Sequence, residues 1–160
     1  MQRRALALSA LICVLALSLA GHAAAATRIA DPAKFVGEVY GRLAKTGSYI
    51  PPEDIYSPRL AGLWALEARE SPKDEVGRID FLFWINGQDG TPSNVKIKTM
   101  PVEGRTDRRI EVVNFVNDKP QTLQFYFERI GGTWKLDDVV STTPGESWTL
   151  SVILKYGWAE

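Results

Sequence analysis

Residues 94–140, NVKIKTMPVEGRTDRRIEVVNFVNDKPQTLQFYFERIGGTWKLDDVV, decide the fold of this chain. Apolar and polar side chains alternate along most of this stretch, which is the pattern of β-strands that bury one face. Turn residues separate the strand segments, and Gly131-Gly132 marks the tightest hairpin. Because strands joined by short turns run in opposite directions, the stretch predicts an antiparallel meander of about four strands.

The same alternation predicts which side chains of the last two strands share a face. Successive side chains of a strand point to opposite sides of the sheet. Asp137 and Asp138 are therefore expected on opposite sides of one strand, where they could not act as a catalytic pair. The inward face is expected to hold Leu123, Phe125, Phe127, Trp134, Leu136 and Asp138.

Two helices are predicted before the sheet. Asp31-Pro32 and Ser57-Pro58 each combine an N-capping side chain with proline at the first helical position. Apolar residues follow at helical spacing, and the helices should end at Gly47 and before Ser71-Pro72. The fold class is therefore α+β, with both helices expected on one face of the sheet.

Two segments allow alternative interpretations. Residues 79–85, IDFLFWI, could form a strand or a short buried segment, and a turn-rich cluster follows them. Residues 146–156 could form a final strand or a helix. Alternation of Trp148, Leu150 and Val152 favours the strand slightly.

The first 26 residues have the organisation of a secretory signal peptide. Basic residues at Arg3 and Arg4 precede an apolar run from Ala5 to Ala20, and small residues follow. The run is shorter than the about 20 residues that span a bilayer, so an uncleaved anchor is the less favoured alternative. Cleavage within Ala23–Thr27 should leave residues 27–160 as one periplasmic or secreted domain without stable membrane insertion.

Such cleavage would remove Cys13 and His22, the only cysteine and histidine of the sequence. The domain would then lack the thiol and imidazole of nucleophilic catalysis, the ligands that zinc prefers, and any disulfide. Loss of Arg3 and Arg4 from equal totals of 19 basic and 19 acidic residues would leave a slightly acidic domain. Nucleic-acid binders are basic, so no nucleic-acid partner is expected. Because the cysteine and histidine ligands would be lost, no metal is expected, and no cofactor is expected either.

Three segments resemble a family of small periplasmic domains of unknown function: residues 56–60 (YSPRL), 83–89 (FWINGQD) and 132–139 (GTWKLDDV). That family resembles the nuclear-transport-factor-two or cystatin-like cone, in which a curved sheet wraps a helix and leaves a pocket. The resemblance covers residues 33–155. It implies the cone and the periplasm but no reaction, because function resides in a site and not in a fold.

Six residues are candidates for binding a ligand. Tyr56 and Arg59 could clamp an anion at the start of the second helix, or form a solvated helix end. Gln88 and Asp89 could hold a polar group, or belong only to a turn. Asn114 interrupts an apolar face and must find hydrogen bonds there. The complete set is Tyr56, Arg59, Gln88, Asp89, Asn114 and Asp138.

Asp138 allows two roles, because a buried carboxylate needs a partner or an altered pKa. A cation such as Arg59, or donors such as Tyr126, Asn114 or backbone N–H groups, would give it a structural role. Otherwise it could be a general acid or base on the floor of the cone. The aromatic side chains of Trp64 and Trp84 are expected in the core rather than in a cavity wall.

Two functional hypotheses follow from these patterns. The first is an exported, non-enzymatic binding or interaction protein, such as an inhibitor or immunity factor, whose partner is an unidentified small molecule or protein. The second is a hydrolase or isomerase that uses Asp138 as its acid–base residue. An exposed aromatic patch would favour the first, and a closed pocket that reaches Asp138 would favour the second.

Overall fold

The computed structural model describes residues 26–71 and 76–158 of the chain. Residues 1–25, which hold most of the predicted signal peptide, lie outside this part. The elements in chain order are α1 (Pro32–Thr46), the short helix η1 (Glu53–Ile55), α2 (Pro58–Glu70), β1 (Ser93–Val102), β2 (Arg105–Asn117), β3 (Lys119–Ile130), β4 (Thr133–Ser141), β5 (Trp148–Thr149) and α3 (Leu150–Tyr156). Within the described residues, no helix is long and apolar enough to cross a membrane.

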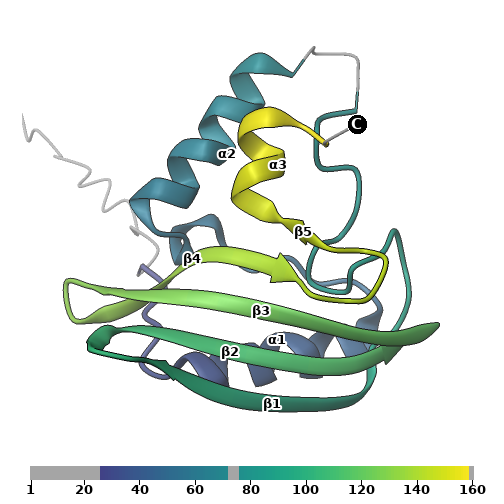
Figure 1. Cartoon of the computed structure of the whole chain (residues 1–160), viewed down its shortest axis with the longest axis horizontal. Helices are drawn as coiled ribbons and strands as arrows, with labels where there is room; N and C mark the ends of the chain where they lie inside the picture. Colours follow the sequence, from purple (N-terminus) through teal and green to yellow (C-terminus); the bar gives the residue numbers. More distant parts are fainter. Residues whose placement is uncertain (1–25, 72–75, 159–160) are drawn as a thin grey trace, which may run out of the picture.

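The predicted antiparallel meander is confirmed, with one strand more than expected. The five strands pair in sequential order from β1 to β5 (Figure 1). Gly131 and Gly132 make the turn between β3 and β4 with φ of 57° and 79°, a region that glycine enters without strain. The domain is therefore α+β, as the switch to strand periodicity near Asn94 predicted.

Both predicted helices begin and end close to their capping residues. The side chain of Asp31 accepts a hydrogen bond from the Lys34 N–H, and that of Ser57 accepts one from the Leu60 N–H. Gly47 ends α1 in the left-handed conformation. Short sequence signals thus suffice to set where α1 and α2 begin and end along the chain.

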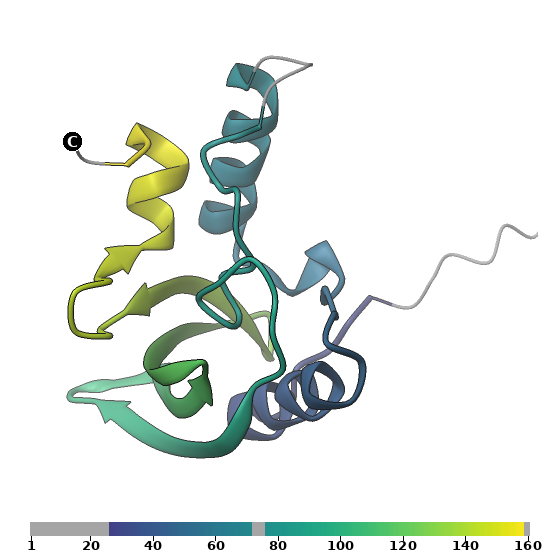
Figure 2. The ribbon, with the colours of Figure 1, turned by 90° about the vertical axis from the view of Figure 1, so that its right-hand side faces the viewer.

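α1 packs against one face of the sheet and closes the main core. Figures 1 and 2 show α1 on the side of the curved sheet that faces away from the viewer in Figure 1. The ring of Tyr40 contacts Phe115 and Phe125 at centroid distances of 5.2 Å and 6.2 Å. The sheet contributes to this core the buried side chains of Val113, Phe115, Leu123, Phe125, Phe127, Trp134, Leu136 and Val139.

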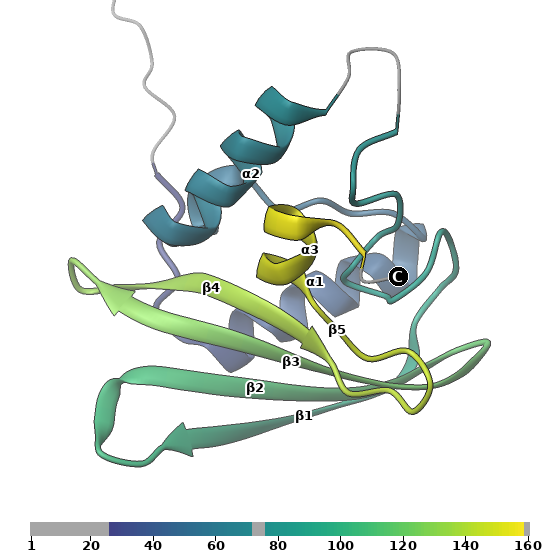
Figure 3. The same ribbon diagram turned by 45° about the horizontal axis from the view of Figure 1, so that its top comes forward.

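α2 does not lie on that face, so the prediction that both helices share it is wrong for α2. Figures 1 and 3 show α2 and α3 side by side beyond the β4 edge of the sheet. The backbone before α2 is held at this edge, where the Ser57 N–H donates to the Leu136 carbonyl at 2.8 Å. Because α2 starts at a strand edge, it leads away from the sheet instead of crossing it.

The structure resolves both ambiguous segments. Residues 79–85 form no strand but a loop that buries Phe83, Trp84 and Ile85. The Tyr40 hydroxyl donates to the Trp84 carbonyl at 2.6 Å and holds this loop against α1. Residues 148–149 form the short strand β5, and the chain then turns into α3, so the slight preference for a strand is correct only for these two residues.

A β-bulge in β4 changes which side chains reach the core. Phe127 pairs with Leu136 and Tyr126 pairs with Asp138, so Asp137 is the additional residue of the bulge. Val139 is buried beyond it, whereas Asp138 is only partly buried. The prediction that Asp138 shares the inward face with Trp134 and Leu136 is therefore wrong. The alternation that supported it breaks at the residue before Asp138.

Candidate functional site

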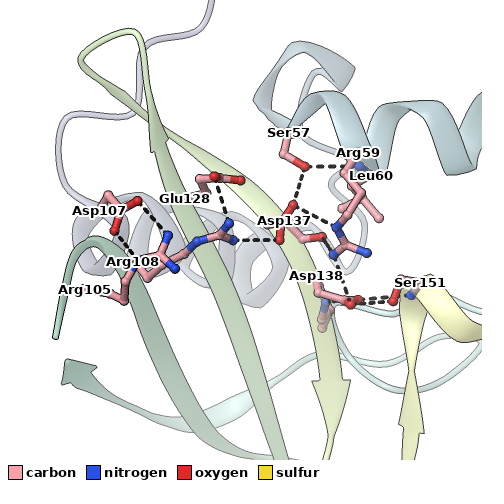
Figure 4. A network of polar contacts seen from close by, with 11 residues as sticks. Ser57, Arg59, Leu60, Arg105, Asp107, Arg108, Glu128, Asp137, Asp138 and Ser151 are labelled. Atoms are coloured by element: carbon pink, nitrogen blue, oxygen red, sulfur yellow. Dashed lines mark hydrogen bonds and ion pairs between the residues drawn. The ribbon is translucent and has the colours of Figure 1, made fainter. Parts of the chain in front are cut away.

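The bulge brings together a group of charged and hydroxyl side chains, which we call the aspartate cluster (Figure 4). Its members come from the start of α2, from β2, β3 and β4, and from the start of α3. Arg59 donates to both adjacent aspartates, from Nε to Asp137 at 3.1 Å and from Nη2 to Asp138 at 3.3 Å. The prediction that the two carboxylates face opposite sides is therefore wrong. The cluster consists of Ser57, Arg59, Arg108, Glu128, Asp137, Asp138 and Ser151.

Asp137 is buried and fully hydrogen-bonded. Its Oδ1 accepts from the Ser57 hydroxyl at 2.6 Å and from Arg59, and its Oδ2 accepts from Arg108 Nη1 at 3.1 Å. Burial by itself would raise the pKa of Asp137. The hydrogen bonds from Arg59 and Ser57 and the charges of Arg59 and Arg108 outweigh burial, so the pKa lies below its ordinary value. Asp137 is therefore held as a carboxylate.

Asp138 also has partners on both oxygens. Oδ1 accepts from the backbone N–H groups of Val139 and Ser151 at 2.9 Å and 3.0 Å. Oδ2 accepts from the Ser151 hydroxyl at 2.5 Å and from Arg59. Of the alternative partners expected for Asp138, Arg59 and backbone N–H groups are present, whereas the Tyr126 hydroxyl donates to Gln124. These contacts give Asp138 a structural role at the start of α3.

A second feature is a pocket between α2 and residues 79–84, which we call the aromatic pocket. It encloses about 450 Å³. Ala61, Ala65 and Ala68 lie on the α2 side, and their helical spacing puts these small side chains on one face of the helix. Because larger side chains there would fill the space, the alanines keep the pocket open. The side chains that matter for its chemistry are Glu53, Tyr56, Trp64, Phe81, Phe83 and Trp84.

Four of the five aromatic rings that line the pocket form a continuous row. Tyr56 stacks with Trp64 at a centroid distance of 6.2 Å and an interplanar angle of 25°. Trp64 contacts Phe83 at 6.2 Å, and Phe83 contacts Trp84 at 5.4 Å. Burial, and secondarily the charge of Glu53, raises the pKa of Tyr56 to about 12. The phenol is therefore a neutral hydrogen-bonding group at any physiological pH.

Two hydrogen-bond donors in this row lack acceptors. Trp64 Nε1 and Trp84 Nε1 are both buried and have no partner among the described residues. Most buried polar atoms in proteins are hydrogen-bonded, and an unpaired one costs about 1–3 kcal/mol. Both tryptophans line the aromatic pocket. Because neither nitrogen atom is accessible to water, both N–H groups point into the protein rather than into the open space of the pocket.

The six candidate residues do not form one site. Arg59 and Asp138 meet in the aspartate cluster, and Tyr56 lies in the aromatic pocket. Gln88 and Asp89 are exposed in the loop before β1. The side chain of Asn114 is exposed, and its Oδ1 accepts a hydrogen bond from Thr122 at 2.9 Å. Asn114 therefore has the hydrogen bond that was expected, but its side chain lies on the exposed face of the sheet, opposite α1, and not on the apolar face.

Sequence reasoning missed several residues of both features. Trp84 is fully buried as expected, yet it and Trp64 also line the aromatic pocket. The spacing of Ala61, Ala65 and Ala68 beside Trp64 was the available signal for a hollow along α2. No comparable signal marks Arg108 and Asp137, because their contact depends on the bulge.

Comparisons of the chain with models of protein families, with curated proteins and with solved structures found no match. The function must therefore be argued from the geometry of the chain itself.

Proposed function

We propose that this protein binds a small, largely apolar molecule in the aromatic pocket. One observation carries the proposal: a cavity of about 450 Å³ is lined mainly by apolar side chains, five of which are aromatic. Pockets for small molecules enclose about 300–1,000 Å³ and combine aromatic walls with a few polar groups that orient the ligand. The aromatic rings supply the walls, and the Tyr56 hydroxyl and the Glu53 carboxylate supply the polar groups.

The walls of the pocket are held in place without a ligand. Glu67 of α2 is buried and accepts from the Arg78 N–H at 2.5 Å and from Arg78 Nη1 at 3.0 Å, which ties the beginning of the loop to α2. The Tyr40 hydroxyl binds the other end of the loop at Trp84. A preformed cavity binds a ligand more tightly than one that must form on binding, because fewer side chains and loops have to be ordered when the ligand associates.

Export and the cone belong to the same proposal. The basic, apolar and small-residue segments within residues 1–26 support binding in the periplasm or outside the cell. The packing of α1 against one face of an antiparallel sheet supports the cystatin-like cone that the resemblance implies. The molecule bound, rather than a reaction catalysed, is what we expect to define the function.

The geometry favours binding over the alternative of a hydrolase or isomerase that uses Asp138. A general acid or base must reach the proton of a substrate. A cavity of about 310 Å³ does reach Asp138, but it is half open rather than closed. Both oxygens of Asp138 already accept hydrogen bonds within the protein, from Val139, Ser151 and Arg59. An inhibitor or immunity role would place a protein on the surface, and no contact of the described residues selects such a partner.

Titration with the neutral fluorophore N-phenyl-1-naphthylamine tests the proposal, because its emission rises in an apolar environment. We expect saturable binding to the purified protein. Ala65→Phe should weaken it at least tenfold by filling the cavity. Ala44→Phe, at an exposed alanine of α1 outside the pocket, is the matched control and should bind like wild type. Absence of saturable binding, or equal binding by Ala65→Phe, would contradict the proposal.

A further inference from the structure

We infer that the aromatic pocket selects organic cations, such as a quaternary ammonium group on an apolar body, over neutral and anionic molecules of the same shape. This inference rests on the proposed function, because it names the ligand class of the same pocket. Three properties of the described residues support it: the negative charge of Glu53, the ion pairs that hold the arginines near α2, and the aromatic walls.

Glu53 gives the pocket its charge. It is the only charged side chain among the described residues that line the cavity. It lies on η1, close enough for its charge to contribute to the raised pKa of Tyr56, although burial contributes more. A carboxylate at a largely apolar cavity attracts a cation and repels an anion.

Acidic partners hold the two arginines near α2, and Lys135, which donates to the Asp54 carbonyl beside Glu53, does not line the pocket. Arg59 is bound by Asp137 and Asp138 in the aspartate cluster. Arg78 is bound by Glu67 and Glu70, with Nη distances of 3.0 Å and 2.9 Å. Neither arginine is among the residues that line the pocket. The pocket itself therefore presents a negative charge.

The walls favour a cation for a second reason. The face of an aromatic ring is electron-rich, and tryptophan binds cations most strongly, followed by tyrosine and phenylalanine. Of the aromatic residues that line the cavity, Tyr56, Trp64 and Phe81 are only partly buried and can present ring surface to a cation, whereas Phe83 and Trp84 are buried behind them. A trimethylammonium group carries its charge on methyl groups, so it can enter an apolar space without needing hydrogen-bond acceptors. This chemistry distinguishes it from a primary amine.

Three probes of one shape separate charge from size: phenyltrimethylammonium, its neutral isostere tert-butylbenzene, and the anion benzenesulfonate. Each competes with N-phenyl-1-naphthylamine for wild-type protein. We expect the cation to displace the fluorophore at concentrations at least tenfold lower than the neutral isostere, and benzenesulfonate to be the weakest. If the neutral isostere or the anion competes as well as the cation, the inference is wrong while the proposed function stands. If the fluorophore itself does not bind, both are wrong.

Glu53→Gln tests the origin of the selectivity. The variant should reduce the preference for phenyltrimethylammonium over tert-butylbenzene about three- to tenfold. Glu38→Gln, at an exposed glutamate of α1 outside the pocket, is the matched control and should keep the wild-type preference. An unchanged preference in Glu53→Gln, with a melting temperature equal to wild type, would overturn the assignment of the charge to Glu53.

Discussion

Asp137 and Asp138, adjacent on β4, each bind the beginning of a different helix (Figure 4). Asp137 accepts from Ser57, the N-cap of α2, and Asp138 accepts from the N–H and hydroxyl of Ser151 in the first turn of α3. This arrangement requires the bulge, because regular alternation would direct the two side chains to opposite faces. Since α2 forms one wall of the aromatic pocket, the carboxylates also fix the shape of the candidate binding site.

Asp137→Asn should destabilise the protein by about 1–3 kcal/mol, because charge-assisted hydrogen bonds from Arg59 and Arg108 are lost at a buried position. Urea denaturation would measure the loss. Asp107→Asn is the matched control, since Asp107 makes a similar paired contact with Arg105 on the exposed part of β2. The control should change stability by less than about 0.5 kcal/mol. Equal effects would show that Asp137 is no more important than a surface aspartate.

The difference in free energy of unfolding between wild type and Asp137→Asn should depend on pH. The pKa of Asp137 is lower in the folded state than in the unfolded state, so the unfolded state binds more protons between the two values. The stability that the Asp137 carboxylate contributes is therefore complete above its pKa in the unfolded state, about 4, and is lost as the pH falls through its pKa in the folded state. Urea denaturation of both proteins at several values between pH 7 and pH 3 should show that the difference in free energy of unfolding decreases toward pH 3. A difference that grows on acidification would contradict the assignment.

Asp138→Asn should also destabilise the folded protein, by about 1–3 kcal/mol. Asparagine can accept from the Ser151 N–H through its single carbonyl oxygen. It cannot also accept from the Ser151 hydroxyl and Arg59 on a second oxygen, as Asp138 does. Thermal melting of the variant beside wild type measures the effect. A variant with unchanged melting that has lost a catalytic activity would instead support the acid–base hypothesis.

The fold was largely predictable because local signals determine it. Asp31, Gly47 and Ser57 mark helix ends through their own side chains and backbone, and strand alternation marks the sheet. The position of α2 was not predictable in this way. It depends on a backbone hydrogen bond between Ser57 and Leu136, residues that are far apart in the sequence.

The site was less predictable for the same physical reason. A bulge adds one residue to a strand without a strong sequence signal. Here it puts Asp137 and Asp138 on the same side of β4, whereas regular alternation predicted opposite sides. Tyr56 and Arg59 are near neighbours in sequence, yet they belong to different features. Tyr56 precedes the N-cap Ser57 and lies outside α2, so helical spacing does not relate its direction to that of Arg59.

Export remains a prediction with a defined chemical consequence. Mass analysis of the secreted product should show a new N-terminus between Ala24 and Thr27. The Thr27 N–H donates to Asp54 Oδ2 at 2.5 Å, and this contact lowers the pKa of Asp54 more than any other. Cleavage after Ala26 would turn that N–H into an α-ammonium group beside a carboxylate. A membrane-bound product that keeps Met1 would contradict the prediction.

Tyr40→Phe tests how the loop of the aromatic pocket is held. The Tyr40 hydroxyl is buried and donates to the Trp84 carbonyl, and burial raises the pKa of Tyr40 well above its ordinary value. Removing this donor leaves a buried carbonyl with one partner fewer, which costs about 1–3 kcal/mol. Tyr126→Phe is the matched control, because the Tyr126 hydroxyl is only part-buried and donates to Gln124 on its own strand. It should change stability by less than about 0.5 kcal/mol.

The two variants should also differ in binding. Tyr40 does not line the pocket, so Tyr40→Phe can act on N-phenyl-1-naphthylamine only through the position of Trp84. We expect several-fold weaker binding by Tyr40→Phe and wild-type binding by Tyr126→Phe. A Tyr40→Phe variant that loses stability but binds the fluorophore like wild type would show that the Trp84 wall keeps its place without this hydrogen bond. The packing of Trp84 on Phe125, at a centroid distance of 4.8 Å, would then be what positions it.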